Sequence, residues 1–557
     1  MDATGTVRTH ADAAWRRVLS RDPVTAIRCG QPVEELPRGG PAALERDVAI
    51  ARAALADLSV VDGAALGGDD RLTLEFLRDH LTQEVAEAER FWYRFPVTPY
   101  QSYVLSDYRA EVLAGAPLAS AADADRYLRL LADYAAVVEQ FHDTLTEQRR
   151  RGIALTGWAA EAALRTMRAH GAASAVLVPG PDRLTGLPPG PASRLVDRAA
   201  RLVAGRIAAA FERLAADLAA AADGAGGDGG TVGIGRLPGG ESAYEGLIRL
   251  NTGLDLTADQ VHALGLAEVA RLTERIRSEL GVEDEAEHRR RLAGDPRMHA
   301  ASPADVERLY QRHLERLAPH LPRYFATLPA APFRLRRLEP ALEGGLTYGF
   351  YQPPGLDGVG YYHYNGSDLA NRPLLQAASV IFHEGMPGHH LQLGRLREAT
   401  GLHPIRRELS ELRTYALNGY LEGWAEYAAG FCEEIGLYDN PLDRYGRLCA
   451  ERFQAARLVV DTGLNVRGWS RARAAEYLEV YGSLSPVEIG TEVYRYAVDD
   501  PGQALAYHIG HWSLRRLRGD GDPRAFHEAV LRPGPLPLRV LAAHVSDSFK
   551  PARPGRS

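Results

Sequence analysis

The sequence predicts a mainly α-helical protein with a small β element, and three observations support this. Long segments rich in Ala, Leu, Arg and Glu carry apolar residues at three- and four-residue steps, as amphipathic helices do. Aromatic-rich, strand-like pieces are confined to two short segments. The chain has 557 residues, 45% hydrophobic and 25% charged, which is ordinary for a globular protein with a sizeable core.

The first part of the chain is dominated by helical periodicity, for example over Leu72–Arg90 and Ala121–Arg150. It ends at a segment with five glycines among seven residues, 224–230, which is too rich in glycine to hold regular structure. We therefore place the main boundary near residue 235. Residues 1–235 are predicted to form a helical scaffold or lid, and residues 236–557 carry the chemical motifs.

The second region begins with helical patterns over Thr257–Leu280, where the threonine can cap the helix, and over Pro303–Leu317. Strands are predicted only near Leu346–Tyr351 and Gly360–Tyr364, which Gly and Pro bound. After Pro373 the helical pattern returns almost to the end. The small β element is therefore expected beside the helix that follows it.

Composition excludes several classes of protein. The net charge of −7 argues against a nucleic-acid-binding protein. Three scattered cysteines are too few for a disulfide framework or a cysteine zinc cage. The first residues lack the basic segment followed by an apolar segment that is typical of a secretory signal. The Ala-rich stretch Ile207–Asp223 is interrupted by charged residues, so it does not predict a membrane span. We therefore expect a cytoplasmic protein with no membrane or nucleic-acid partner; the oligomeric state stays open.

The chemistry is concentrated where an apolar helix runs into His383-Glu384, a Pro387-Gly388 break and then His389-His390. A catalytic zinc needs three N or O ligands and a neighbouring base. The usual zinc helix has its two histidines four residues apart, whereas here they are six or seven apart. On an ideal helix, His389 would lie about 240° around from His383 and His390 about 10.5 Å along the axis. The helix must therefore deform at Pro-Gly, and a two-residue bulge favours His389 over His390.

The third ligand is predicted in the next helix, over residues 412–436. Glu422 lies there among apolar residues, where an unpaired carboxylate is costly. Gly419 and Gly423 are four residues apart and allow another helix to approach closely. Glu426, one turn on, either supports a ligand or is a solvated charge on an amphipathic helix; we favour the solvated charge.

Several segments resemble a known family, the domain-of-unknown-function 885 family. The resemblance rests on Gly233–Glu241, Leu254–Val269, His383–Gln392, Glu422–Ala425, Arg457–Gly463 and Pro501–Tyr507. The most specific of these reads HEGMPGHHLQ. Family members are mostly helical and are regarded as zinc-dependent peptidases, so the resemblance implies a large helical metallopeptidase-like fold.

The resemblance places zinc on His383, His389 and Glu422, with Glu384 as general base. It also shows two departures. The family usually has histidine near the position of Asn465 and often has lysine where this chain has His508. These departures motivate an alternative, a metallohydrolase specialised for one amide or related bond of a small metabolite.

Further site residues are expected around the metal. Tyr507 and His508 are candidate hydrogen-bond donors to a developing oxyanion. His363 and Asn365, at the second predicted strand, would contact substrate or simply cap the strand.

Arg372, Tyr494 and Arg495 could anchor a carboxylate, although arginines in so Arg-rich a chain are usually at the surface. Together these predictions describe a zinc hydrolase of a small peptide or peptide-like amide substrate. A metal-free binding protein on the same scaffold is the competing class.

Overall fold

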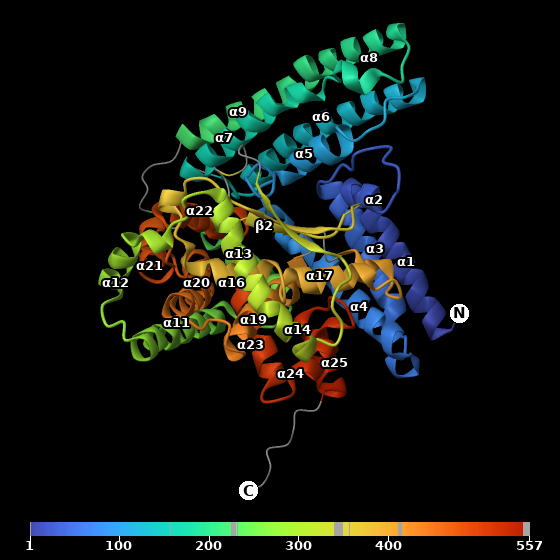
Figure 1. Cartoon of the computed structure of the whole chain (residues 1–557). Coiled ribbons are helices and arrows are strands. Elements are labelled where there is room, and N and C mark those ends of the chain that lie inside the picture. Colours follow the sequence, from blue (N-terminus) through green and yellow to red (C-terminus); the bar gives the residue numbers. More distant parts are fainter. Residues whose placement is uncertain are drawn as a thin grey trace.

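The computed structural model describes residues 2–155, 157–223, 230, 232–338, 343, 349–355, 357–409 and 415–549. It confirms the mainly α fold with a small β element (Figure 1). The helices before residue 235 are α1 Ala3–Arg21, α2 Pro23–Arg28, α3 Pro41–Ser59, α4 Gly68–Arg90, α5 Tyr103–Asp107, α6 Ala121–Arg150, α7 Gly157–Ala173, α8 Pro189–Leu202 and α9 Ala208–Asp223. Most of the glycine-rich segment 224–230 lies outside the described residues.

The later helices include α16 and α17, which carry the motif. They are α10 Gly240–Thr252, α11 Ala258–Leu280, α12 Glu285–Ala293, α13 Pro303–Leu317, α14 Leu321–Tyr324, α16 Ala377–Glu384, α17 His389–Glu398, α18 Pro404–Arg407, α19 Asn418–Glu434, α20 Pro441–Val466, α21 Arg471–Tyr481, α22 Pro486–Tyr494, α23 Leu505–Arg518, α24 Pro523–Leu531 and α25 Leu538–Ser548. The predicted cap is confirmed, because Thr257 and Gln260 form a reciprocal capping box at the start of α11.

Within the described residues, the sheet has three strands in the order β1-β3-β2. β1 (Phe333–Arg337), which sequence reasoning missed, pairs with β3 (Gly360–Tyr364) in parallel, and β2 (Gly349–Gln352) pairs with β3 antiparallel. β3 has the bounds that the sequence predicted. Of the other predicted strand, residues 346–348 lie outside the described residues.

Among the described residues, two large hydrophobic cores and one small cluster around Leu396 are buried. The first includes Tyr134 of α6 and Val459 of α20, and the second includes Leu77 of α4 and Trp424 of α19. Each core thus draws on both sides of residue 235, so the predicted division into two regions stays a prediction. Within the described ranges, no helix is both long and apolar enough to cross a bilayer.

Helix α20 is the central helix of the second region, and nearly all of its residues from Tyr445 to Asn465 are buried. It packs against α11, α16 and α23. Figure 1 shows α6–α9 stacked as an elongated layer at one end of the molecule, with α24 and α25 at the opposite end. The motif helices α16 and α17 lie between these two ends.

Candidate metal centre

The motif folds as two helices joined by a sharp break. α16 ends at Glu384 and α17 begins at His389, so the predicted interruption is confirmed, as a four-residue break rather than a two-residue bulge. Gly388 makes it feasible: a Cβ there would lie 1.9 Å from the carbonyl oxygen of His383. Only glycine therefore lets the chain fold back this closely.

Helix α19 brings the third candidate ligand to this break. Its Gly423 meets α23 at Gly510, where a Cβ on Gly423 would lie 2.5 Å from the Gly510 Cα. The predicted close helix approach is thereby confirmed. The Trp424 indole donates a hydrogen bond to the carbonyl of Pro387 over 3.1 Å, which ties α19 directly to the break.

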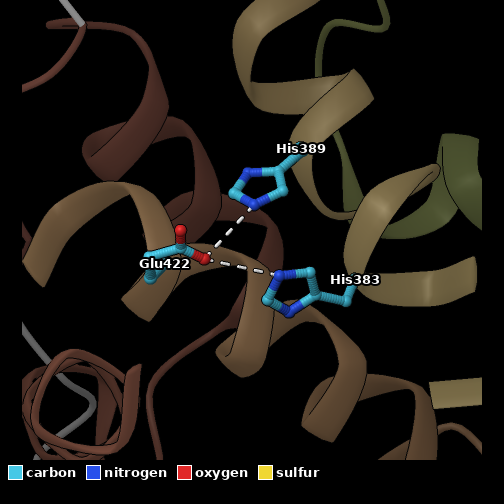
Figure 2. Close-up of side chains that lie close together, drawn as sticks. All are labelled: His383, His389 and Glu422. Atoms are coloured by element: carbon cyan, nitrogen blue, oxygen red, sulfur yellow. Dashed lines mark ion pairs between the residues drawn. The ribbon is translucent and has the colours of Figure 1, made fainter. Parts of the chain in front are cut away.

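The three side chains His383, His389 and Glu422 point toward one another (Figure 2). The Glu422 Oε2 atom lies 3.5 Å from His383 Nε2 and 3.4 Å from His389 Nε2. The ligand atoms of all three residues lie within 4.8 Å of one another. Two atoms that each lie about 2.1 Å from a tetrahedral zinc are about 3.4 Å apart, so this donor set has the spacing and chemistry of a zinc site.

His390 belongs to a different environment. Its Nδ1 lies 2.9 Å from the Tyr351 hydroxyl and its Nε2 lies 3.0 Å from the carbonyl oxygen of Ala331. The side chain is buried, and it is not part of the cluster. Of the two histidines left open by the sequence, the structure brings His389 to the other candidate ligands.

The prediction that Glu426 is a solvated charge is wrong, because its side chain is only 5% exposed. Its Oε1 lies 3.1 Å from His383 Nδ1, and its Oε2 lies 3.4 Å from Arg447. Burial opposes the charged form, but the contacts with His383 and Arg447 outweigh it and lower the pKa of Glu426 to about 2. A carboxylate behind a ligating imidazole fixes its ring and tautomer.

Charges within the cluster are strongly coupled. Burial disfavours the imidazolium of His383, yet hydrogen bonds with Glu422 and Glu426 raise its pKa to about 10. Burial works against the charge of Glu422 too, but its two histidine partners lower its pKa. Burial raises the pKa of Glu384, although the two histidines and a backbone hydrogen bond from Tyr351 oppose this. A carboxyl group with a raised pKa is suited to exchanging protons near neutral pH.

The cluster lines a cavity of about 590 Å³. Two of the candidate site residues, Tyr507 and Arg495, line it, and Arg495 is buried rather than at the surface, where arginines are expected. The Tyr507 ring stacks 6.3 Å from that of His383. Sequence reasoning gave no role to Arg457 or Glu492, which also line it. A signal existed for Arg457, an arginine within the apolar run from Ala455 to Val460, where a charge has to find a buried partner.

Four predicted substrate contacts do not line this cavity. His363 bonds Gln352 across the sheet. Asn365 donates to the carbonyl of Glu343, and its Oδ1 accepts from Ser367, so it caps the strand end. The reason is topological: β3 is the central strand, and β2 is the edge strand whose residues Gly349–Tyr351 face the cavity.

Arg372 and Tyr494 are the other two. Arg372 lines a separate, more apolar cavity of about 330 Å³. The Tyr494 hydroxyl donates to the carbonyl of Ala159, and its ring packs edge-on against Trp158. Tyr494 therefore contributes to packing between the two predicted regions.

The prediction that His508 is a donor at the metal site is also wrong. Successive residues on α23 face different directions, so Tyr507 faces the cavity while His508 is buried beside Glu268, with its Nε2 3.6 Å from a Glu268 oxygen. Asn465 bonds the backbone of Ile234 and Tyr496 and does not line the cavity. Neither departure from the family pattern lies at the site, so neither argues here for a specialised substrate.

Comparisons with known proteins identify one family and several similar solved structures, among them the following two. The model of the family described as "Bacterial protein of unknown function (DUF885)" matches residues 23–545. A crystal structure of "the putative lipoprotein from Colwellia psychrerythraea" has a TM-score of 0.83 and 20% identity, covering 98% of this chain and 99% of that one. A structure of "a putative lipoprotein of unknown function from Shewanella oneidensis" has a TM-score of 0.70 and 17% identity, covering 96% and 99%. No curated protein matches the chain.

These neighbours contradict the predicted cytoplasmic location, because both are described as lipoproteins. The prediction rested on composition and charge, which indicate only that a domain folds in water. A domain held at a membrane by a lipid folds in water too, so composition does not distinguish the two cases.

Proposed function

Since the chain belongs to the DUF885 family of bacterial proteins of unknown function, its activity has to be argued from its own site, and we propose a zinc-dependent hydrolase of amide or peptide bonds. The observation that carries the proposal is the cluster of His383, His389 and Glu422, with ligand atoms within 4.8 Å of one another. Two imidazoles and one carboxylate are a common catalytic zinc set, which leaves a position open.

Zinc, when bound by these three residues, would supply Lewis-acid chemistry, polarising a carbonyl and lowering the pKa of water from 15.7 to about 7. Glu384 follows His383 directly and lines the same cavity. Its carboxylate would take a proton from the attacking water and deliver it to the leaving nitrogen. The backbone hydrogen bond from Tyr351 holds this carboxylate in place.

Two further features support a hydrolase. Burial keeps the pKa of Tyr507 above its usual value, so its hydroxyl stays protonated and can donate to a developing oxyanion. The cavity of about 590 Å³ lies within the range of small-molecule sites, which is about 300–1,000 Å³. A small peptide or a peptide-like amide is therefore the substrate that we propose.

The test combines metal analysis with a panel of di- and tripeptides. The wild-type protein, reconstituted with zinc and desalted, is expected to retain about one equivalent and to hydrolyse peptides. Glu384→Gln should keep the zinc and lose nearly all turnover, because the amide cannot take the proton. Glu476→Gln, on the exposed face of α21, is the matched control. Less than half an equivalent of zinc, or normal turnover by Glu384→Gln, would contradict the proposal.

A further inference from the structure

One end of the cavity carries more positive charge than its own acids neutralise. Arg457 and Arg495 both line it, and both are more than nine-tenths buried. Glu492 is the one acid of the cavity lining that contacts both, at 3.3 Å from Arg457 and 3.7 Å from Arg495. The buried carboxyls of Asp499 and Asp500, outside this lining, also interact electrostatically with Arg495. The Glu492 carboxylate also accepts a hydrogen bond from the Tyr496 hydroxyl. Guanidinium groups stay charged at any ordinary pH, whereas burial raises the pKa of Asp499 and Asp500 and so disfavours their charged forms. Within the lining of this end, two guanidinium groups therefore face one carboxylate.

The other acids of the cavity are engaged at its metal end. Glu422 faces the two histidines, and Glu426 is held between His383 and Arg447. Glu384 accepts its hydrogen bond from the β2 backbone. A buried charge without a full counterion is costly, and an anionic ligand that enters the cavity would offset that cost.

The two arginines lie close to the metal end. The Arg457 guanidinium lies 4.7 Å from the centre of the Tyr507 ring, and that ring is 6.3 Å from the ring of His383. Together these distances put the guanidinium within about 11 Å of His383. The Arg495 guanidinium donates a hydrogen bond to the Tyr507 hydroxyl. An extended chain advances about 3.3–3.6 Å per residue, so a group held by this pair is within roughly three residues of a bond at the metal.

We propose that Arg457 and Arg495 bind a carboxylate of the substrate, which makes short peptides with a carboxylate within about three residues of the cleaved bond the preferred substrate class. This substrate class rests on the proposed function, which identifies the cleaved bond as an amide or peptide bond. The chemistry suits the task, because planar guanidinium groups pair with carboxylates through charge-assisted and often bidentate hydrogen bonds. The carboxylate can come from the peptide terminus or from an acidic side chain, and the experiment separates the two.

The experiment measures peptide binding to the zinc-free, full-length protein by calorimetry, so it does not depend on turnover. Three probes are compared: Ala-Ala-Ala, its C-terminal amide, and Ala-Asp-Ala amide. We expect the free acid to bind about 10- to 100-fold more tightly than the plain amide, as loss of a hydrogen-bonded charge implies. If only Ala-Asp-Ala amide binds tightly, the carboxylate that the arginines bind is that of an acidic side chain and not that of the peptide terminus. Equal affinities for all three, or no binding at millimolar concentration, would overturn the proposal.

A variant ties the preference to the pair. Arg495→Gln should remove most of the difference between acid and amide, whereas Arg46→Gln, an exposed arginine of α3, should leave it intact. If Arg495→Gln kept the full preference, the pair would not be the anchor. The probes on wild-type protein decide the question even where that variant does not fold. Failure of zinc-loaded protein to cleave any peptide would instead count against the proposed hydrolase alone.

Discussion

The break between α16 and α17 can be tested by adding one methyl group. In Gly388→Ala the new Cβ would lie 1.9 Å from the carbonyl oxygen of His383 and 2.6 Å from that of Phe382. Since Cβ atoms essentially never approach other atoms to less than 3.0 Å, the break has to open by at least about 1.1 Å. Both obstructing atoms are backbone, so no side-chain rotation relieves the overlap.

The displacement acts on the metal site, because Gly388 lies directly between the two histidines in the fold. His383 and His389 each lie about 3.5 Å from the same Glu422 oxygen, and metal–ligand distances tolerate only about 0.2 Å. A misplacement of about 1 Å costs roughly 100-fold in the rate of a positioned active site, and we use the same scale for a displaced metal ligand. We therefore expect zinc affinity to fall by at least about 100-fold, or about 2.7 kcal/mol.

The assay is competition for zinc against a chromophoric chelator at constant pH, with circular dichroism to confirm the helical content. Gly490→Ala is the matched control, because Gly490 lies in α22 with no atom within 4 Å of an added Cβ. That substitution should leave zinc affinity unchanged and stabilise the helix by about 0.5–1 kcal/mol. A folded Gly388→Ala protein that binds zinc within threefold of the wild type would refute the account of the break.

Four further predictions follow from the site. Glu426→Gln removes the charge behind His383 and should weaken zinc binding about 10- to 100-fold in the chelator assay; unchanged affinity would mean that Glu426 does not support the ligand. Tyr507→Phe should lower kcat about 100-fold at unchanged zinc content, and an unaltered kcat in peptide assays would exclude the hydroxyl as a donor. Because the pKa of His383 is raised to about 10 without metal, zinc has to displace a proton, so affinity should rise up to tenfold per pH unit toward pH 10. By the same linkage, the contribution of His383 to the free energy of unfolding of metal-free protein is full below about pH 6.5 and lost as the pH rises through 10; denaturant titrations that show no loss over this range would contradict it.

The sequence by itself determined the local features. Helical periodicity predicted the mainly α fold, and an aromatic-rich segment bounded by glycine and proline predicted the limits of β3. The spacing around Pro387-Gly388 predicted a break, and Gly423 predicted a close helix contact. These succeed because periodicity, backbone restriction and the absence of a Cβ act over a few residues and leave a direct mark on the sequence.

Tertiary structure alone decided which side chains share a cavity. Arg457 and Glu492 lie 35 residues apart and meet through the packing of α20 and α22, whereas the neighbours Tyr507 and His508 face opposite environments. Glu426 is predicted as solvated but is buried, because its face of α19 is covered by α20. Side-chain direction depends on the rotation and crossing of packed helices, and these are set by the whole core rather than by neighbouring residues.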